Sequence, residues 1–335
     1  MQTLTELAYL GAAILFILGM KRLQSPATAR VGNQLAAAGM LLAVVATLFL
    51  HRILTPVEMI AGLAIGAAVG AVLARRVEMT GMPELVAVFN GFGGLASALV
   101  AGAEVTRYLT GSTGESIVTQ VLQAGPVLAA FTTTDAVTVF FSVAIGMITF
   151  SGSFVAFGKL GGYVSGNPIS FPGMRVLTVL VTLGAIAGGA YMVVGAAEFP
   201  TEADPVLIGL MGLAALALVL GILLVIPIGG ADMPVVVALL NSYSGLAAAA
   251  TGFVLDNTAL IVSGALVGAS GLILTKIMCD AMNRSLLNVL LGGFGGEADE
   301  GVEVEGGRTD MSVNETSVED VAILLTYCLL YTSDA

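Results

Sequence analysis

Charged residues and the residue types that usually build active sites are scarce in this 335-residue sequence. Only 10% of the residues are charged, and the chain has two cysteines and one histidine, His51. Two cysteines are too few for a disulfide framework, and no histidine, cysteine or carboxylate residues have the spacing of a metal site. Phosphate-loop, GxSxG and strand-to-helix GxGxxG motifs are also missing. We therefore predict no catalytic residue, no metal site and no cofactor-binding residue in this chain.

Long apolar stretches are what the sequence has in quantity. Hydrophobic residues make up 57% of the chain and the mean hydropathy is +0.99, well above the level of globular domains. Nine stretches approach the roughly 20 residues that cross a hydrocarbon core; they are about 4–20, 33–50, 56–74, 83–103, 135–157, 176–197, 205–228, 233–254 and 258–279. Strand-like alternation is weak, which argues against a barrel. We predict an all-α polytopic membrane protein with about nine transmembrane helices.

The basic residues are unevenly divided between alternate connections of these helices. Nine of the eleven that precede the tail fall in one set, namely Lys21, Arg22, Arg30, Arg75, Arg76, Lys159, Arg175, Lys276 and Arg284. Only Arg52 and Arg107 fall in the other set. Because lysine and arginine concentrate on the cytoplasmic side, we predict an N-terminus outside and a C-terminus in the cytoplasm.

Most of the formal net charge of -11 belongs to the end of the chain. Residues 297–335 contain ten acidic residues and one basic residue, Arg308. Residues 292–320 are rich in glycine and charge, which is the composition of a flexible linker. We predict a membrane domain over 1–291 and an acidic linker over 292–315, and the charge gives no reason to expect a nucleic-acid partner.

A fourteen-residue pattern occurs twice. MPELVAVFNGFGGL covers Met82 to Leu95, and MPVVVALLNSYSGL covers Met233 to Leu246. Each copy places one asparagine, Asn90 or Asn241, eight positions after its methionine, roughly 12 Å along a helix. With four predicted helices from one copy to the next, the two copies run in the same direction, as in a parallel repeat. The two amides are therefore expected at a similar depth in the membrane.

Two interpretations of the asparagine pair remain open. One is interhelical hydrogen bonding, which contributes about 1 kcal/mol or less in membranes. The other is a hydrated path lined by polar side chains of this region, namely Asn90, Ser153, Asn241, Ser242, Tyr243 and Ser244. An amide does not titrate near neutral pH. These residues would therefore order water without being the protonated relay.

The predicted cytoplasmic ends carry three further candidates. Glu84 and Asp232 stand at helix starts, where a carboxylate is either a cap and dipole partner or part of a gate that contacts a soluble domain. Arg284 follows the last span and is either a membrane anchor or part of the same contact. A glycine repeat at Gly62, Gly66 and Gly70 predicts close helix packing, as do Gly264 and Gly268.

Several segments resemble the beta subunit of the proton-translocating NAD(P) transhydrogenase. They are RRVEMTGMPELVAVFNGFGGLAS, TFSGSFVAFGKL, GGADMPVVVALLNSYSGLAAAATGF, VSGALVGASG and IMCDAMNRS, and the resemblance extends from about residue 5 to 325. It implies a multi-subunit enzyme of a bacterial or archaeal-type cytoplasmic (inner) membrane that couples hydride transfer from NADH to NADP+ with inward proton movement. In that family the alpha subunit binds NAD(H), and the beta subunit supplies nine membrane helices and a C-terminal NADP(H)-binding domain.

The resemblance also assigns roles to individual positions. Asn90 and Asn241 match polar positions of the family's proton pathway, and Asp232 and Arg284 match residues that couple it to the NADP(H) domain. Gly268, Ala269, Ser270 and Gly271 match a small-residue turn on the last helix. Many members have histidine where this chain has Asn90, which implies that a membrane helix of the alpha subunit supplies the relay histidine. His51 is a weaker candidate for that relay.

The last twenty residues resemble the family only in part. TSVEDVAILL at 316–325 resembles the first helix of the NADP(H)-binding domain, whereas the final ten residues do not resemble its continuation. We expect residues 316–335 to be the start of a truncated domain with a non-native end, and the isolated chain not to be catalytic. The whole enzyme is expected to be a dimer of alpha–beta units. A secondary transporter or channel subunit without redox chemistry is the alternative, because a parallel repeat and mid-helix amides would serve it equally well.

Overall fold

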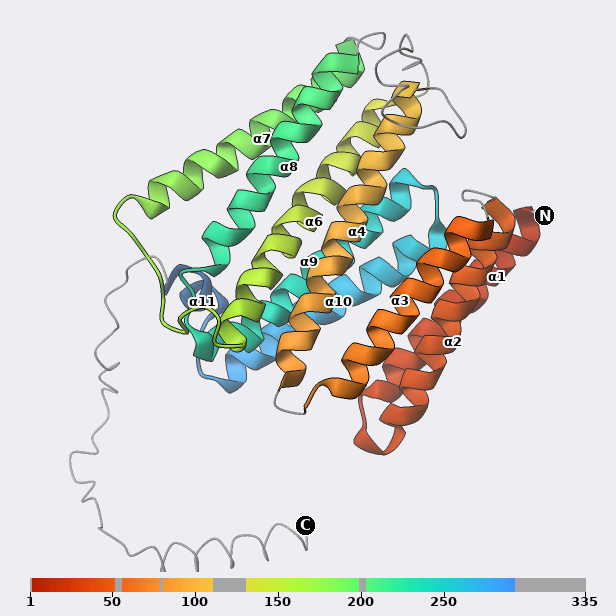
Figure 1. The fold of residues 1–335 in the computed structure, drawn as a ribbon, viewed down its shortest axis with the longest axis horizontal. Helices are drawn as coiled ribbons and strands as arrows, with labels where there is room; N and C mark the ends of the chain where they lie inside the picture. The colour runs from red at the N-terminus through yellow and green to blue at the C-terminus, as the bar shows by residue number, and fades with distance from the viewer. Residues whose placement is uncertain (1, 52–55, 79–80, 111–130, 199–202, 293–335) are drawn as a thin grey trace, which may run out of the picture. The chain divides into compact units, whose positions relative to one another are not determined.

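The computed structural model describes residues 2–51, 56–78, 81–110, 131–198 and 203–292 (Figure 1). Within these ranges the elements are helices and none is a strand. The predicted linker, from residue 293 on, and the predicted domain start at 316–335 lie outside the described residues.

Each of the nine predicted spans corresponds to one long helix. The helices are α1 (Gln2–Leu23), α2 (Pro26–His51), α3 (Pro56–Arg76), α4 (Met82–Thr110), α6 (Thr133–Leu160), α7 (Met174–Glu198), α8 (Ala203–Val225), α9 (Met233–Val254) and α10 (Thr258–Ala281). Eight of them are long and apolar enough to cross a membrane, and α3 contributes the shorter apolar stretch Ile60–Leu73. A 3-10 turn, η3 (Gly230–Asp232), and a short helix, α11 (Leu286–Gly292), complete the described elements. The prediction of an all-α polytopic membrane protein is confirmed, and the orientation of the termini stays a prediction.

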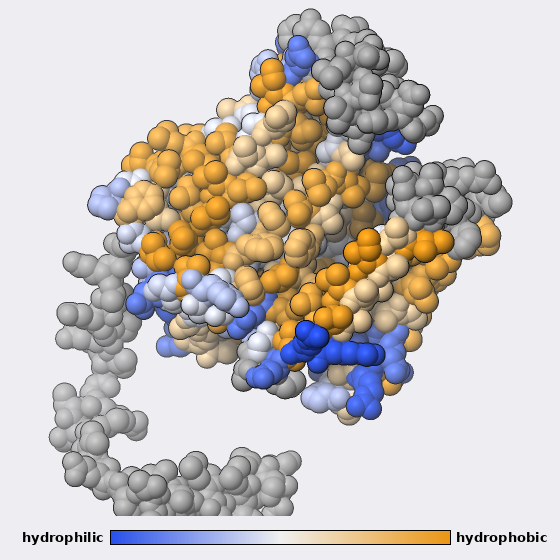
Figure 2. Space-filling model, viewed as in Figure 1, coloured by the Kyte–Doolittle hydropathy of each residue, from blue (hydrophilic) through white to orange (hydrophobic). Residues whose placement is uncertain are grey.

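Helices α4, α6 and α9 contact one another at the centre of the bundle (Figure 1). α6 also packs against α7 and α8, while α9 packs against α10, and the α1–α2 hairpin contacts α10 through α1. The face shown in Figure 2 is mostly hydrophobic, and hydrophilic residues lie along its lower edge. Leu180 of α7 and Met211 of α8 are 60% and 70% exposed, respectively. Apolar side chains such as these can contact lipid, whereas a charged side chain in contact with lipid would cost free energy.

Glycines permit the closest helix contacts. A Cβ atom added to Gly94 of α4 would lie 2.7 Å from the carbonyl oxygen of Gly146 on α6, and one added to Gly146 would lie 2.5 Å from the carbonyl oxygen of Gly94. On α9, a Cβ atom at Gly245 would lie 2.5 Å from the backbone nitrogen of Gly268 on α10. Small residues let backbones approach in this way where lipid provides no hydrophobic drive between helices. The close packing predicted for α10 is therefore confirmed.

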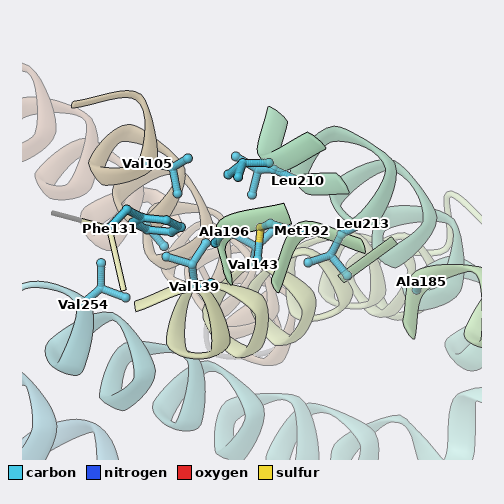
Figure 3. Close-up of a cluster of buried hydrophobic side chains, with 13 residues drawn as sticks. Val105, Phe131, Val139, Val143, Ala185, Met192, Ala196, Leu210, Leu213 and Val254 are labelled. Atoms are coloured by element: carbon cyan, nitrogen blue, oxygen red, sulfur yellow. The ribbon is translucent and has the colours of Figure 1, made fainter. Parts of the chain in front are cut away.

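The glycines of α3 behave differently. Added Cβ atoms at Gly62, Gly66 and Gly70 would have no atom within 4 Å. The close packing predicted for this repeat is therefore not made with the described part of the chain, because spacing identifies a small-residue face without identifying its partner. Figure 3 shows a buried hydrophobic cluster formed by other helices, to which Val105 of α4, Val139 and Val143 of α6, Met192 of α7, Leu213 of α8 and Val254 of α9 belong.

Candidate functional site

Asn90 is the centre of a polar cluster that joins three helices. Its side-chain nitrogen Nδ2 donates to the hydroxyl of Ser153 on α6 at 2.9 Å, and its Oδ1 accepts from the hydroxyl of Ser244 on α9 at 2.7 Å. Asn90 is 9% exposed and Ser153 is 1% exposed. A buried amide in a membrane helix must find such partners. We call Asn90, Ser153 and Ser244 the Asn90 cluster.

The other predicted path residues of α9 lie apart from this cluster. The backbone carbonyl of Asn241 accepts from Ser244 at 2.8 Å, but the half-buried Asn241 amide has no hydrogen-bond partner among the described residues. Ser242 donates to the carbonyl of Gly268 on α10 at 2.6 Å. Tyr243 packs against an apolar cluster that includes Val236 and Met278. The structure thus brings Asn90, Ser153 and Ser244 together, and it uses Ser242 and Tyr243 to attach neighbouring helices.

The predicted small-residue turn lies in the middle of a continuous helix, α10. Gly268 and Gly271 are buried on its α9 side, and a Cβ atom at Gly271 would lie 2.8 Å from the backbone of Ser242. Ala269 is exposed, and the hydroxyl of Ser270 donates to the Val267 carbonyl within the same helix. The turn therefore acts as a packing face for α9 at the level of Ser242.

A groove with a volume of about 700 Å³ opens beside the Asn90 cluster. It lies among α1, α2, α4, α9 and α10, and its lining is mostly apolar. Ser97 and Gly93 of α4 and Ser244 of α9 are among the residues that line it. The cluster is therefore accessible from the groove through Ser244.

Asp232 and Arg284 form an ion pair at the N-terminal end of α9. Nη1 of Arg284 lies 2.9 Å from each carboxylate oxygen of Asp232. The Asp232 side chain is 11% exposed and the Arg284 side chain is 45% exposed. The Asp232 side chain accepts no capping hydrogen bond from the backbone of α9, so its carboxylate bonds to the arginine and not to the helix start. Glu84 is half-buried near the end of α6, with Oε2 3.1 Å from where a Cβ atom on Gly161 would lie.

The end of α10 sets the place of Arg284. Asn283 has a positive φ of 53°, the backbone N–H of Arg284 donates to the Cys279 carbonyl, and that of Asn283 donates to the Asp280 carbonyl. These two bonds and the left-handed residue are a Schellman motif, which terminates a helix and fixes the direction of the next residue. Asparagine is one of the few residues besides glycine that adopts this conformation readily.

Lys159 holds the loops at this end together. Its ammonium group is buried and donates to the carbonyls of Asn167 at 3.1 Å, Ile226 at 2.6 Å and Ile228 at 2.7 Å. The carbonyls of Ile226 and Ile228 follow the end of α8, where free acceptors favour a cation. The connection that leads to Asp232 is thereby attached to α6, the helix that carries Ser153.

Comparison with known proteins assigns this chain to a family. Residues 5–329 match the family described as NAD(P) transhydrogenase beta subunit. Two curated relatives from Rhodospirillum rubrum, each called NAD(P) transhydrogenase subunit beta, are 43% identical over 327 residues, which is 96% of this chain and 65% of each relative. The chain belongs to the NAD(P) transhydrogenase beta subunit family. Together with eight apolar spans, this membership identifies a multi-pass protein of the bacterial inner-membrane type.

The chain spans about two-thirds of these relatives, 65% of their length. The part of the chain that the structure describes has no strand and therefore no strand–helix–strand unit for a dinucleotide. No group of histidine, cysteine and carboxylate residues in the described ranges has the arrangement of a metal site. His51 ends α2, and its side chain lies outside the described atoms.

Sequence reasoning missed several buried polar residues of this chain. Ser142 of α6 and Thr251 of α9 are 0% and 2% exposed, and their hydroxyl oxygens lie 2.6 Å apart. Glu104 of α4 is buried beside Arg107 in an ion pair. Thr251 stands seven positions after Ser244, and Ser97 stands seven after Asn90. A search for polar residues two helical turns from each cluster member would have found Thr251 and Ser97, but not Ser142.

Proposed function

We propose that this chain is the membrane subunit of a proton-translocating, Re/Si-specific NAD(P)+ transhydrogenase, in which hydride transfer between NADH and NADP+ is coupled to proton movement. The chain supplies the proton path. The observation that carries this proposal is the Asn90 cluster, a buried amide between two hydroxyls at the meeting of α4, α6 and α9, in a chain that belongs to the beta subunit family.

The cluster is suited to ordering a hydrogen-bonded path. An amide offers both donors and an acceptor, and each hydroxyl donates one proton and accepts two. None of these groups titrates near neutral pH. The protonated relay is therefore proposed to come from the alpha subunit, as a histidine on a membrane helix whose side chain reaches Ser244 from the groove. Asn241 is proposed to line the same path when water or this partner meets its amide.

The end of the bundle that carries Arg284 is proposed to couple the proton path to the NADP(H)-binding domain. Asp232, Arg284 and Glu84 lie at the ends of α9, α10 and α4 that face the loops held by Lys159. NADP(H) is proposed to bind in the domain that begins near residue 316 and NAD(H) in the alpha subunit, so the isolated chain would not be catalytic. If protonation changes the affinity for nucleotide, nucleotide must change the affinity for the proton by the same factor.

The test uses the complete beta subunit, co-expressed with its alpha subunit and reconstituted in vesicles as the proposed dimer of alpha–beta units. NADPH-driven reduction of an NAD+ analogue and the pH of the vesicle lumen are recorded together. We expect both signals from the wild type, and loss of proton movement in Asn90→Leu and Asn241→Leu. Thr178→Val is the control, because Thr178 is as buried as Asn90 but bonds only within α7. Reduction without any change of lumenal pH would overturn the proton-path proposal, and proton movement without hydride transfer would favour a transporter or channel subunit.

A further inference from the structure

A second set of polar contacts joins the same three helices as the Asn90 cluster. The hydroxyls of Ser142 on α6 and Thr251 on α9 lie 2.6 Å apart, and either can donate to the other. Both also lie within hydrogen-bonding distance of the carbonyl of Ser97 on α4, at 3.2 Å and 3.3 Å. The carbonyl of Ala247 lies 3.4 Å from the Ser142 hydroxyl and 2.9 Å from that of Thr251. We call Ser142 and Thr251 the hydroxyl pair.

The hydroxyl pair lies farther from the Asp232–Arg284 end than the Asn90 cluster does. Seven residues separate Asn90 from Ser97 on α4, and seven separate Ser244 from Thr251 on α9. Seven residues are close to two turns of helix, a rise of about 10.5 Å on the same face. On both α4 and α9, the polar face thus continues in the same direction from the Asn90 cluster to the hydroxyl pair.

The number of acceptors around the hydroxyl pair exceeds the number of its protons. Two hydroxyls provide two protons, whereas two backbone carbonyls and the two hydroxyl oxygens themselves can accept. The bond between the two hydroxyls can therefore run in either direction without leaving a donor unsatisfied. Reversal of such a bond is what a proton-passing step between two groups requires. Helix attachment alone would be met by a single hydroxyl bonded to one carbonyl.

The groove connects the two levels on one side, and an apolar cluster covers the hydroxyl pair on the other. Ser97 and Ser244 both line the groove, and the Ser97 hydroxyl donates to the carbonyl of Gly93, which lines it too. One turn beyond the pair along each helix, Val139 of α6 and Val254 of α9 belong to the buried cluster of Figure 3. The groove thus lies beside the Asn90 cluster at Ser244 and beside the hydroxyl pair at Ser97, and apolar side chains follow the pair along α6 and α9.

We propose that Ser142 and Thr251 form a second station of the proton path, about two helical turns from the Asn90 cluster. This inference rests on the proposed function of the chain. As a water molecule delivers a proton to one hydroxyl oxygen, the proton already on that oxygen passes to the other hydroxyl, which releases its own proton to a second water molecule near Ser97, the residue that both hydroxyls contact and that lines the groove. One proton enters and one leaves, and no other bond changes.

The experiment measures proton movement by the complete alpha–beta complex in vesicles, with the wild type and four variants. Thr251→Val keeps the shape of the side chain and removes its hydroxyl, and Thr251→Ser restores the hydroxyl. Thr149→Val is the matched control, because Thr149 is also fully buried, on α6, but its hydroxyl bonds only to the Ile145 carbonyl of its own helix. Ser142→Ala removes the partner hydroxyl and leaves a space the size of one oxygen atom.

We expect Thr251→Val and Ser142→Ala to slow coupled proton movement at least about tenfold, a bound set below the roughly 10²–10⁴-fold that a positioned proton-transfer group typically contributes. Thr251→Ser and Thr149→Val should remain close to the wild type, and the thermal unfolding of Thr251→Val should match that of Thr149→Val. Proton movement by Thr251→Val and Ser142→Ala at the rate of Thr149→Val would overturn the proposal while leaving the Asn90 path intact. Failure of the wild type to move protons would instead overturn the proposed function, and the second station with it.

Discussion

The hydroxyl of Ser244 donates a 2.7 Å hydrogen bond to Oδ1 of Asn90, a residue 154 positions away in the chain. The same amide donates to Ser153 on a third helix. One side chain therefore joins the two copies of the repeated pattern to each other and to α6. The contribution of this contact to stability can be measured by mutation.

A double-mutant cycle of Asn90→Ala and Ser244→Ala should give a coupling energy of about 0.6 kcal/mol and not more than about 1.7 kcal/mol, as for other hydrogen bonds between membrane helices. The free energy of unfolding in detergent or lipid is the quantity to measure. Asn90→Ala combined with Thr178→Val on α7 is the control, and these two effects should add. A coupling energy indistinguishable from that control would show that the contact contributes nothing to stability.

Gly94→Ala should destabilise the bundle, whereas Gly93→Ala should not. A Cβ atom at Gly94 would lie 2.8 Å from Cβ of Thr149 and closer still to the α6 backbone, while one at Gly93 would have no atom within 4 Å. Overpacking of this kind typically costs about 1–3 kcal/mol. The yield of folded protein and its midpoint of thermal unfolding would separate the two neighbours. Equal behaviour of the two variants would contradict the close approach of α4 and α6.

Arg284→Gln should destabilise the chain more than Asp232→Asn. Loss of the arginine leaves an 11% exposed carboxylate without its partner, whereas loss of the carboxylate leaves a guanidinium that is 45% exposed and can be hydrated. Because of that exposure the pair itself should contribute only about 1 kcal/mol or less. Unfolding in detergent measures both variants, with the exposed Asp280→Asn on α10 as the control. The reverse order would mean that the arginine, rather than the aspartate, depends on the pair.

Asn283→Gly should be tolerated, and Asn283→Val should not. The φ of 53° at this position suits glycine and strains a β-branched residue. The strain should cost on the order of 1–3 kcal/mol and should displace Arg284, the next residue. Thermal unfolding would compare the two variants. Tolerance of valine would show that α10 does not end in a left-handed residue.

Gly66→Leu should be far milder than Gly264→Leu in this chain. An added side chain at Gly66 meets no atom within 4 Å, whereas at Gly264 it would meet the backbone of α9. The measurement is the yield of folded protein in detergent, with this chain expressed without a partner subunit. If Gly66→Leu were as damaging as Gly264→Leu, α3 would have to pack against a neighbour within the chain.

Composition and run length were sufficient to predict the nine helices, because each apolar stretch must satisfy its own backbone in lipid. The repeated pattern also predicted that Asn90 and Asn241 stand at equivalent positions. It did not predict that only Asn90 would have polar partners. The reason lies in the neighbours, since α4 packs its glycines against α6 whereas α9 packs its glycines against α10. A motif specifies which residues share a face, and the rest of the bundle decides what that face meets.

The same limit explains Ser142, Thr251 and Lys159. Each is a single polar residue in an apolar or loop-flanking stretch, and although its spacing from Ser244 indicates Thr251, nothing in the sequence shows which groups any of the three contacts. Their partners are largely backbone carbonyls of other helices and loops, which every residue possesses. Only the fold shows which carbonyls are near.

The glycine contacts also divide the centre of the bundle into two closely packed helix pairs. Gly94 with Gly146 brings the backbones of α4 and α6 into contact, and Gly245 with Gly268 does the same for α9 and α10. The bond from Asn90 to Ser244 and the bond from Ser142 to Thr251 both cross from the first pair to the second. A small rotation of one pair as a unit would therefore break or remake both polar contacts together, while the Asn90–Ser153 bond, which lies within one pair, would persist.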